Sequence, residues 1–133
     1  MTRATTFALG AACLLAHGAF AQTSAGSSNP VGVWRGTSLC LVHPSSCNDE
    51  SVVYRITRVN ATDSLSVDGR RVVNGKEVEM GVLGCLLDAR GTRFTCTNPK
   101  GVFRFTVRGD SLVGEGRLRD NTNYRDISAA RSR

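Results

Sequence analysis

Short runs of β-branched and aromatic residues recur along this 133-residue chain, and each run ends at glycine, asparagine, aspartate or proline. Turn residues at intervals of about eight to twelve positions are typical of antiparallel all-β proteins. No window from Val31 onward shows the 3.6-residue periodicity of an amphipathic helix. The eight expected strands are Val31–Val42, Ser51–Val59, Ser64–Arg70, Lys76–Asp88, Arg93–Asn98, Val102–Arg108, Ser111–Arg119 and Tyr124–Ala130.

The joints between these runs are short and carry turn chemistry. Asn74-Gly75 suits a tight hairpin turn because both positions accept a positive φ, and Gly109-Asp110 is similar. Pro99-Lys100-Gly101 indicates one further reversal. A two-sheet sandwich needs long crossing connections, and only the loop from His43 to Glu50 is long. The pattern therefore predicts an eight-stranded up-and-down meander that closes into a small barrel, since closure removes exposed strand edges.

Alternation assigns faces to the later strands. Phe103, Phe105 and Val107 fall on one face of their strand, with polar residues between them. In the next strand Gly114 and Gly116 share the apolar face, which predicts a crowded or strongly bent wall.

The first 21 residues have the features of a secretory signal peptide. Arg3 supplies a positive start, an apolar run extends from Phe7 to Ala16, and Ala19-Phe20-Ala21 is a small-x-small cleavage pattern. The apolar run is shorter than the roughly 20 residues that a membrane-spanning helix needs. We therefore expect an exported protein without a transmembrane segment, cleaved after Ala21 and located in the periplasm or outside the cell.

Cleavage leaves a polar flexible linker at 22–30, one barrel domain at 31–133, and four cysteines. An even number of cysteines in a small exported protein indicates disulfides. A hairpin with the loop 89–92 places Cys85 opposite Cys96, and by exclusion Cys40 pairs with Cys47. Each bridge should stabilise the fold by about 2 to 3 kcal/mol. The spacing does not match the paired Cys-x-x-Cys knuckles of zinc sites.

The chain is basic, with 17 lysine and arginine residues against 11 acidic ones. Without Arg3 the net charge is +5 by count, from 16 basic and 11 acidic residues. The arginines are spread from Arg35 to Arg133, mostly near an acid, which argues for a solvated surface and against a nucleic-acid site. Weak attraction to envelope lipid or acidic polysaccharide stays open as an alternative.

The opening strand reads Gly32-Val33-Trp34-Arg35-Gly36, and a Gly-x-Trp there resembles the calycins, the lipocalin-like barrels. The resemblance implies that Trp34 closes one end of the barrel and that Arg125, from the last strand, covers it through a cation–π contact. The short mature length is closer to avidin-like barrels and to small exported bacterial metalloprotease inhibitors. The segments 34–40 and 47–56 also resemble small exported bacterial proteins that have no assigned activity.

Functional side chains gather in the loop from Cys40 to Cys47 and just after it, where a barrel mouth would open. A catalytic Ser-His-Asp set, a cation held by acidic side chains, and a plain solvated loop are the alternatives for this segment. The candidate ligand-binding residues are Trp34, His43, Ser45, Ser46, Asp49, Glu50 and Arg125.

One histidine after cleavage and scattered carboxylates do not form a recognisable catalytic set, and no cofactor is expected. The sequence favours a non-enzymatic exported barrel that binds a small ligand in its mouth or a protein surface at the stapled loop. A periplasmic protease inhibitor and an envelope-associated structural protein are the alternatives.

Overall fold

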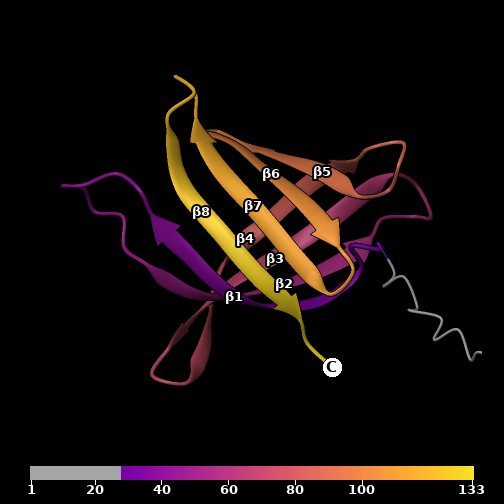
Figure 1. The fold of residues 1–133 in the computed structure, drawn as a ribbon, viewed down its shortest axis with the longest axis horizontal. Helices are drawn as coiled ribbons and strands as arrows, with labels where there is room; N and C mark the ends of the chain where they lie inside the picture. The colour runs from indigo at the N-terminus through magenta and orange to yellow at the C-terminus, as the bar shows by residue number, and fades with distance from the viewer. Residues whose placement is uncertain (1–27) are drawn as a thin grey trace, which may run out of the picture.

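A computed structural model describes residues 28–133, so the predicted signal peptide and most of the predicted linker lie outside the described residues. The described chain forms one closed antiparallel barrel in which each strand pairs with its neighbours in chain order (Figure 1). The predicted eight-stranded meander is therefore confirmed, and the architecture is consistent with a lipocalin-like barrel. The strands are β1 (Gly32–Cys40), β2 (Glu50–Arg58), β3 (Ser64–Val73), β4 (Lys76–Leu87), β5 (Arg93–Asn98), β6 (Gly101–Arg108), β7 (Ser111–Leu118) and β8 (Asn123–Arg131).

The two ends of the barrel differ. We call the end with the β1–β2 loop, residues 41–49, the open end, and the end with Ser28 and Arg131 the closed end. The β1–β2 loop and the β3–β4 hairpin project on the left of Figure 1, away from the C-terminus. The hairpin turn matches its prediction, because Asn74 and Gly75 adopt φ angles of 49° and 74°.

Side chains that alternate inward fill the barrel. Phe94 stacks on Phe105 with ring centroids 4.9 Å apart, and Tyr54 meets Phe105 edge-on at 5.7 Å. The predicted inward face of β6 is confirmed, since Phe105 and Val107 are buried and Phe103 is partly buried. A core built from these rings leaves little free volume in the middle of the barrel.

Two glycines on the inner face of β7 make room for these rings. Gly114 lies opposite Phe105, and Gly116 lies opposite Phe103. A Cβ at Gly114 would lie 2.5 Å from Phe105 Cδ1, and one at Gly116 would lie 2.8 Å from Phe103 Cε1. The crowded inner wall predicted for this strand is therefore observed, and the aromatic rings of the neighbouring strand cause it.

Both predicted disulfides are present, Cys40–Cys47 and Cys85–Cys96. The first joins the end of β1 to the β1–β2 loop. The second lies in the shortest ladder of the barrel, because β4 and β5 pair only from Cys85 to Leu87. The Cys85–Cys96 bridge therefore ties the two strands together just where they begin to diverge.

Trp34 closes the barrel end near the N-terminus of the described chain. Its side chain is fully buried, and its indole Nε1 donates a 2.8 Å hydrogen bond to the carbonyl oxygen of Pro30. Pro30 is itself buried, so packed structure begins inside the segment predicted to be a flexible linker.

The basic residue over Trp34 is Arg131, whose guanidinium carbon lies 4.3 Å from the centroid of the ring. The prediction that Arg125 covers Trp34 is wrong. In the β1–β8 ladder Trp34 pairs with Arg131, whereas Arg125 pairs with Cys40, six residues further along β1. At about 3.3 Å per residue, that separation places Arg125 about 20 Å away, at the open end.

Candidate functional site

A cavity of about 360 Å³ opens to solvent at the open end of the barrel. Its walls come from every strand except β7, and it lies over the inward aromatic residues. Its lining residues are Ser38, Glu50, Tyr54, Val67, Gly69, Met80, Gly81, Val82, Leu83, Asn98, Lys100, Phe103, Phe105, Tyr124 and Arg125.

The divergence of β4 from β5 creates this cavity. From Lys76 to Gly84 the strand β4 pairs with β3 alone. Leu83 is therefore not hydrogen-bonded to β5, and it lines the cavity together with Asn98 and Lys100. The backbone register of β3 and β4 also shifts next to Gly69, which leaves Met80 as an extra residue in β4. Such a bulge bends a strand and redirects a side chain, and here Met80 is added to the wall of the cavity.

The floor of the cavity is apolar and rigid. Val67, Phe105 and Tyr54 are buried beneath it, and Leu83 and Phe103 pack against the same core. The rings of Phe103 and Phe105 are stacked with centroids 6.3 Å apart. An apolar group entering the cavity would therefore meet side chains that are already held in place.

One wall of the cavity is polar. Ser38 is buried at 4 % exposure, and it lines the cavity together with Tyr54. Burial raises the pKa of Tyr54 well above its ordinary value, and the neighbouring Ser38 side chain offsets only part of that rise. The phenol therefore stays neutral and protonated at physiological pH.

The rim of the cavity carries an excess of positive charge. Arg125 Nη2 lies 3.7 Å from Glu50 Oε2, and Arg125 Nη1 donates to the carbonyl oxygens of Ser38, at 3.2 Å, and Asn48. Lys100 is exposed on the opposite rim, and its ammonium group has no ion-pair partner within residues 28–133. The rim therefore presents two cations and one anion.

The structure divides the predicted site residues into three groups. Glu50 and Arg125 line the cavity. Trp34 lies at the closed end, fully buried under Arg131. The remaining four residues belong to the β1–β2 loop beside the cavity without lining it: His43, Ser45, Ser46 and Asp49.

The polar side chains of this loop hold the loop itself in shape. His43 Nε2 lies 3.0 Å from the Cys40 carbonyl oxygen, and Asp49 Oδ1 accepts the Cys40 backbone N–H at 2.8 Å. Ser45 donates to the Val42 carbonyl oxygen at 2.7 Å. The Ser45 hydroxyl, the His43 imidazole and the Asp49 carboxylate each bond to backbone groups and not to one another, so these side chains do not form a catalytic Ser-His-Asp set.

Ser46 is exposed, and its carbonyl oxygen accepts a 3.3 Å hydrogen bond from the Asn48 side chain. Within residues 28–133 no cluster of three or more His, Cys, Asp or Glu side chains could bind a metal ion. The same part of the chain has no helix with the length and apolar character that crossing a membrane requires.

Sequence reasoning missed most of the cavity wall, including Val67, Met80, Leu83 and Lys100. These residues come from two strands and a turn, and their separation in sequence hides their proximity. One signal was available, since Gly81 interrupts a strand-like run and an isolated glycine in a strand often marks a bulge.

No known protein-family model matches this chain, and no curated protein matches it. The function proposed below therefore rests on the geometry and chemistry of the cavity.

Proposed function

We propose that this protein is a non-enzymatic binding module that holds a small amphipathic ligand in the open end of its barrel. The single observation that supports the proposal is the cavity of about 360 Å³ with an apolar floor and a polar rim. Small-molecule sites in proteins are concave, mostly apolar, and supplied with a few well-placed polar groups. A volume near the lower end of their usual range suits a ligand with one or two rings or a short chain.

The polar groups that line the cavity indicate the chemistry of the ligand's polar end. Among residues 28–133 Lys100 has no carboxylate partner, Arg125 lies on the rim, and Tyr54 keeps its hydroxyl proton. All three groups donate hydrogen bonds, and two of them are cationic. We therefore infer a ligand whose apolar body enters the cavity and whose head accepts hydrogen bonds or carries a negative charge, such as a weak organic acid.

The two disulfides support a location outside the cytoplasm, because such bridges persist in oxidising compartments. Together with the predicted signal peptide, they favour an encounter with this ligand in the periplasm or the medium.

A direct test uses 8-anilinonaphthalene-1-sulfonate, which joins apolar rings to one anionic group. We expect a one-to-one complex by native mass spectrometry and a rise in the dye's fluorescence that saturates. The variant Gly69→Gln should weaken this binding, because a Cβ at Gly69 meets its neighbours at an ordinary 3.7 Å and the added side chain would occupy the cavity. Excluding about 60 Å² of apolar ligand surface lowers the binding free energy by about 1.5 kcal/mol, or about tenfold in affinity.

The matched control is Gly84→Gln, on the exposed face of β4, where an added Cβ meets no atom of residues 28–133 within 4 Å. Binding should be unchanged in this variant. A third variant, Lys100→Glu, leaves the core untouched and should weaken binding of the anionic dye. Equal affinity in the wild type and in all three variants would show that the dye binds elsewhere and would refute the cavity as the site.

A second candidate function is a protein-facing role for the β1–β2 loop. The Cys40–Cys47 bridge and the hydrogen bonds of Ser45 and Asp49 hold this loop in one conformation, and Leu41 is 46 % exposed on it. A loop that is already ordered loses little conformational entropy when it enters a partner's cleft. Inhibition assays against exported metalloproteases and serine proteases test this role, and failure to slow any of them would remove protease inhibition as an explanation.

A further inference from the structure

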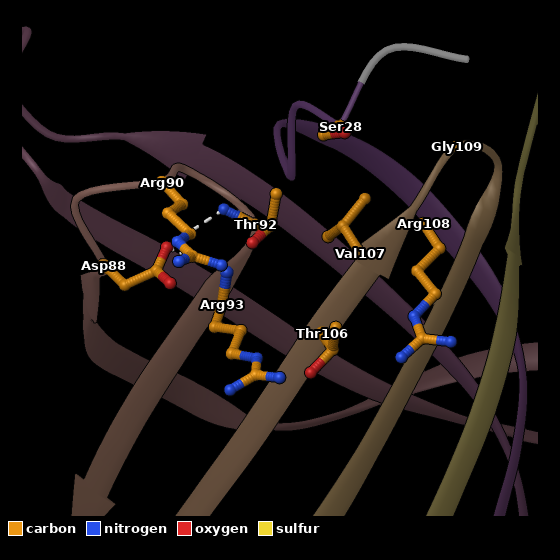
Figure 2. Close-up of a pocket in the computed structure, with 9 residues that line it drawn as sticks. All are labelled: Ser28, Asp88, Arg90, Thr92, Arg93, Thr106, Val107, Arg108 and Gly109. Carbon is orange, nitrogen blue, oxygen red and sulfur yellow. Dashed lines mark hydrogen bonds between the residues drawn. The ribbon is translucent and has the colours of Figure 1, made fainter. Parts of the chain in front are cut away.

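A second concave surface lies near the closed end of the barrel, on the outside of β5 and β6 (Figure 2). It is a groove of about 460 Å³ between the turn that joins β4 to β5 and the turn that joins β6 to β7. Three of the nine residues around it are arginines. The lining residues are Ser28, Asp88, Arg90, Thr92, Arg93, Thr106, Val107, Arg108 and Gly109.

Strand register explains how these arginines meet. Arg93 of β5 pairs directly with Thr106 of β6, and Arg108 lies two residues further along β6, on the same outer face. Figure 2 shows the side chains of Arg93 and Arg108 extending in the same direction on either side of Thr106. Arg90 joins them from the β4–β5 turn, so three guanidinium groups from separate parts of the chain border one groove.

These three side chains are exposed, and none of them forms an ion pair within the described part of the chain. Two acids close to the groove, Asp110 and Glu115, are already engaged. Asp110 pairs with Arg131 at 3.1 Å, and Glu115 pairs with Arg104 and Arg117 at 3.5 and 2.9 Å. The groove arginines are therefore available to an external anion.

Asp88 is the one acid among the residues that line the groove. Its Oδ1 accepts the backbone N–H groups of Arg93 and Thr92 at 3.1 and 3.0 Å, and these bonds lower the pKa of its carboxyl below the ordinary value. Asp88 is thus ionised and shapes the turn. Three guanidinium groups against one carboxylate leave the groove with a net charge of +2.

We propose that this groove is a binding site for a phosphate monoester or a diphosphate. Guanidinium groups bind phosphate oxygens in bidentate pairs, and the hydroxyls of Thr92 and Thr106 supply further hydrogen-bond donors. A monoester with a charge of about −1.5 to −2 balances the +2 of the groove, which a singly charged sulfate ester does not. The site lies outside the barrel and is independent of the cavity at the open end.

The same chemistry could reach the groove on a free phosphorylated molecule or on the headgroup of a lipid. The first experiment titrates the folded protein with inorganic pyrophosphate by isothermal calorimetry and two-dimensional NMR. We expect saturable binding that weakens with added salt, with shifts confined to the amides around residues 88–93 and 106–109. Each of Arg93→Ala and Arg108→Ala should reduce affinity about tenfold or more, because each removes charge-assisted hydrogen bonds.

The matched control is Arg71→Ala in the β3–β4 hairpin, an exposed arginine that has no ion-pair partner in the described part of the chain. This variant should bind pyrophosphate as the wild type does. The substitutions lie on outer faces and should leave the thermal unfolding curve nearly unchanged. Equal losses of pyrophosphate affinity in Arg71→Ala and Arg93→Ala would indicate diffuse attraction to a basic surface and would overturn the proposal. The proposal would also be overturned if the wild-type protein did not bind pyrophosphate.

The second experiment separates the two sources of the phosphate group. Vesicles of phosphatidylcholine containing phosphatidic acid display a phosphate monoester, whereas vesicles containing phosphatidylglycerol display only a diester. Binding to the first kind alone, lost in Arg93→Ala, identifies a lipid headgroup. Binding of pyrophosphate without vesicle binding identifies a soluble phosphorylated ligand. Equal binding to both kinds of vesicle, unchanged in Arg93→Ala, contradicts a phosphate site in the groove.

Discussion

Gly36 lies where the barrel closes, and its replacement by alanine should loosen that closure. Gly36 pairs with Ala129 in the ladder between the first and last strands. A Cβ at Gly36 would lie 2.5 Å from the Ala129 Cα and closer still to the carbonyl oxygen of Ser128, whereas real Cβ contacts essentially never fall below 3.0 Å. Both neighbours are backbone atoms, so β1 and β8 must move apart.

The size of the effect follows from this geometry. Overpacking a well-filled site costs about 1 to 3 kcal/mol, and a clash with backbone on a closing ladder belongs at the upper end of that range. The lower unfolded-state entropy of alanine offsets about 0.4 to 1 kcal/mol. We expect Gly36→Ala to lower the free energy of unfolding by about 2 kcal/mol, and the melting temperature by about 8 to 16 °C for a domain of this size.

Urea unfolding followed by circular dichroism and by Trp34 fluorescence measures this change. The control is Gly84→Ala, because a Cβ at Gly84 has no neighbour within 4 Å in the described part of the barrel. That variant should keep the wild-type stability or gain up to about 1 kcal/mol. If Gly36→Ala matched Gly84→Ala within error, the closure of β1 on β8 described above would be incorrect.

Three further predictions concern the closed end, the β4–β5 ladder and the surface. Arg131→Ala removes the cation–π contact with Trp34, so it should lower the free energy of unfolding by about 1 to 2 kcal/mol and change the fluorescence emission of Trp34. Unchanged Trp34 emission in this variant would contradict the contact. Replacing Cys85 and Cys96 together by serine should lower the free energy of unfolding by about 2 to 3 kcal/mol in urea, and a smaller change would show that the strands hold together without the bridge. Hydrogen bonds from Arg117 and Arg104 lower the pKa of the Glu115 carboxyl in the folded protein below its ordinary value of 4.5. The ionised carboxylate therefore stabilises the fold above pH 4.5, and this stabilisation is lost as the pH falls through the pKa of the folded state. Glu115→Gln should therefore flatten the decline in stability below pH 4.5, and an unchanged acid profile would exclude this contribution.

The features that sequence reasoning predicted well depend on residues close together in the chain. The pairing of Cys85 with Cys96 follows from the length of one hairpin loop, because register in a hairpin is set by its turn. The aromatic face of β6 follows from two-residue alternation. These patterns act between neighbours, so each can be derived without knowing the rest of the barrel.

Features that depend on several strands at once could not be derived in this way. The arginine over Trp34 is Arg131 and not Arg125, because the register between β1 and β8 is set by closure of the whole barrel. The sequence placed functional side chains at one end of the first strand, and of these Glu50 lines the cavity, where Arg125 joins it from β8. Which of them would face a ligand depended on how the loop folded on itself.

The sequence by itself determined the all-β meander, its turns and its two disulfides, because local alternation, turn residues and loop lengths specify them. Only the tertiary structure decided where the cavity opens and where the arginines cluster. Divergence of β4 from β5 and the bulge at Met80 open the cavity, and the folding of two strands and a turn brings Arg90, Arg93 and Arg108 around one groove. Cavities and charge clusters are properties of residues distant in sequence, and only packing of the closed barrel places such residues side by side.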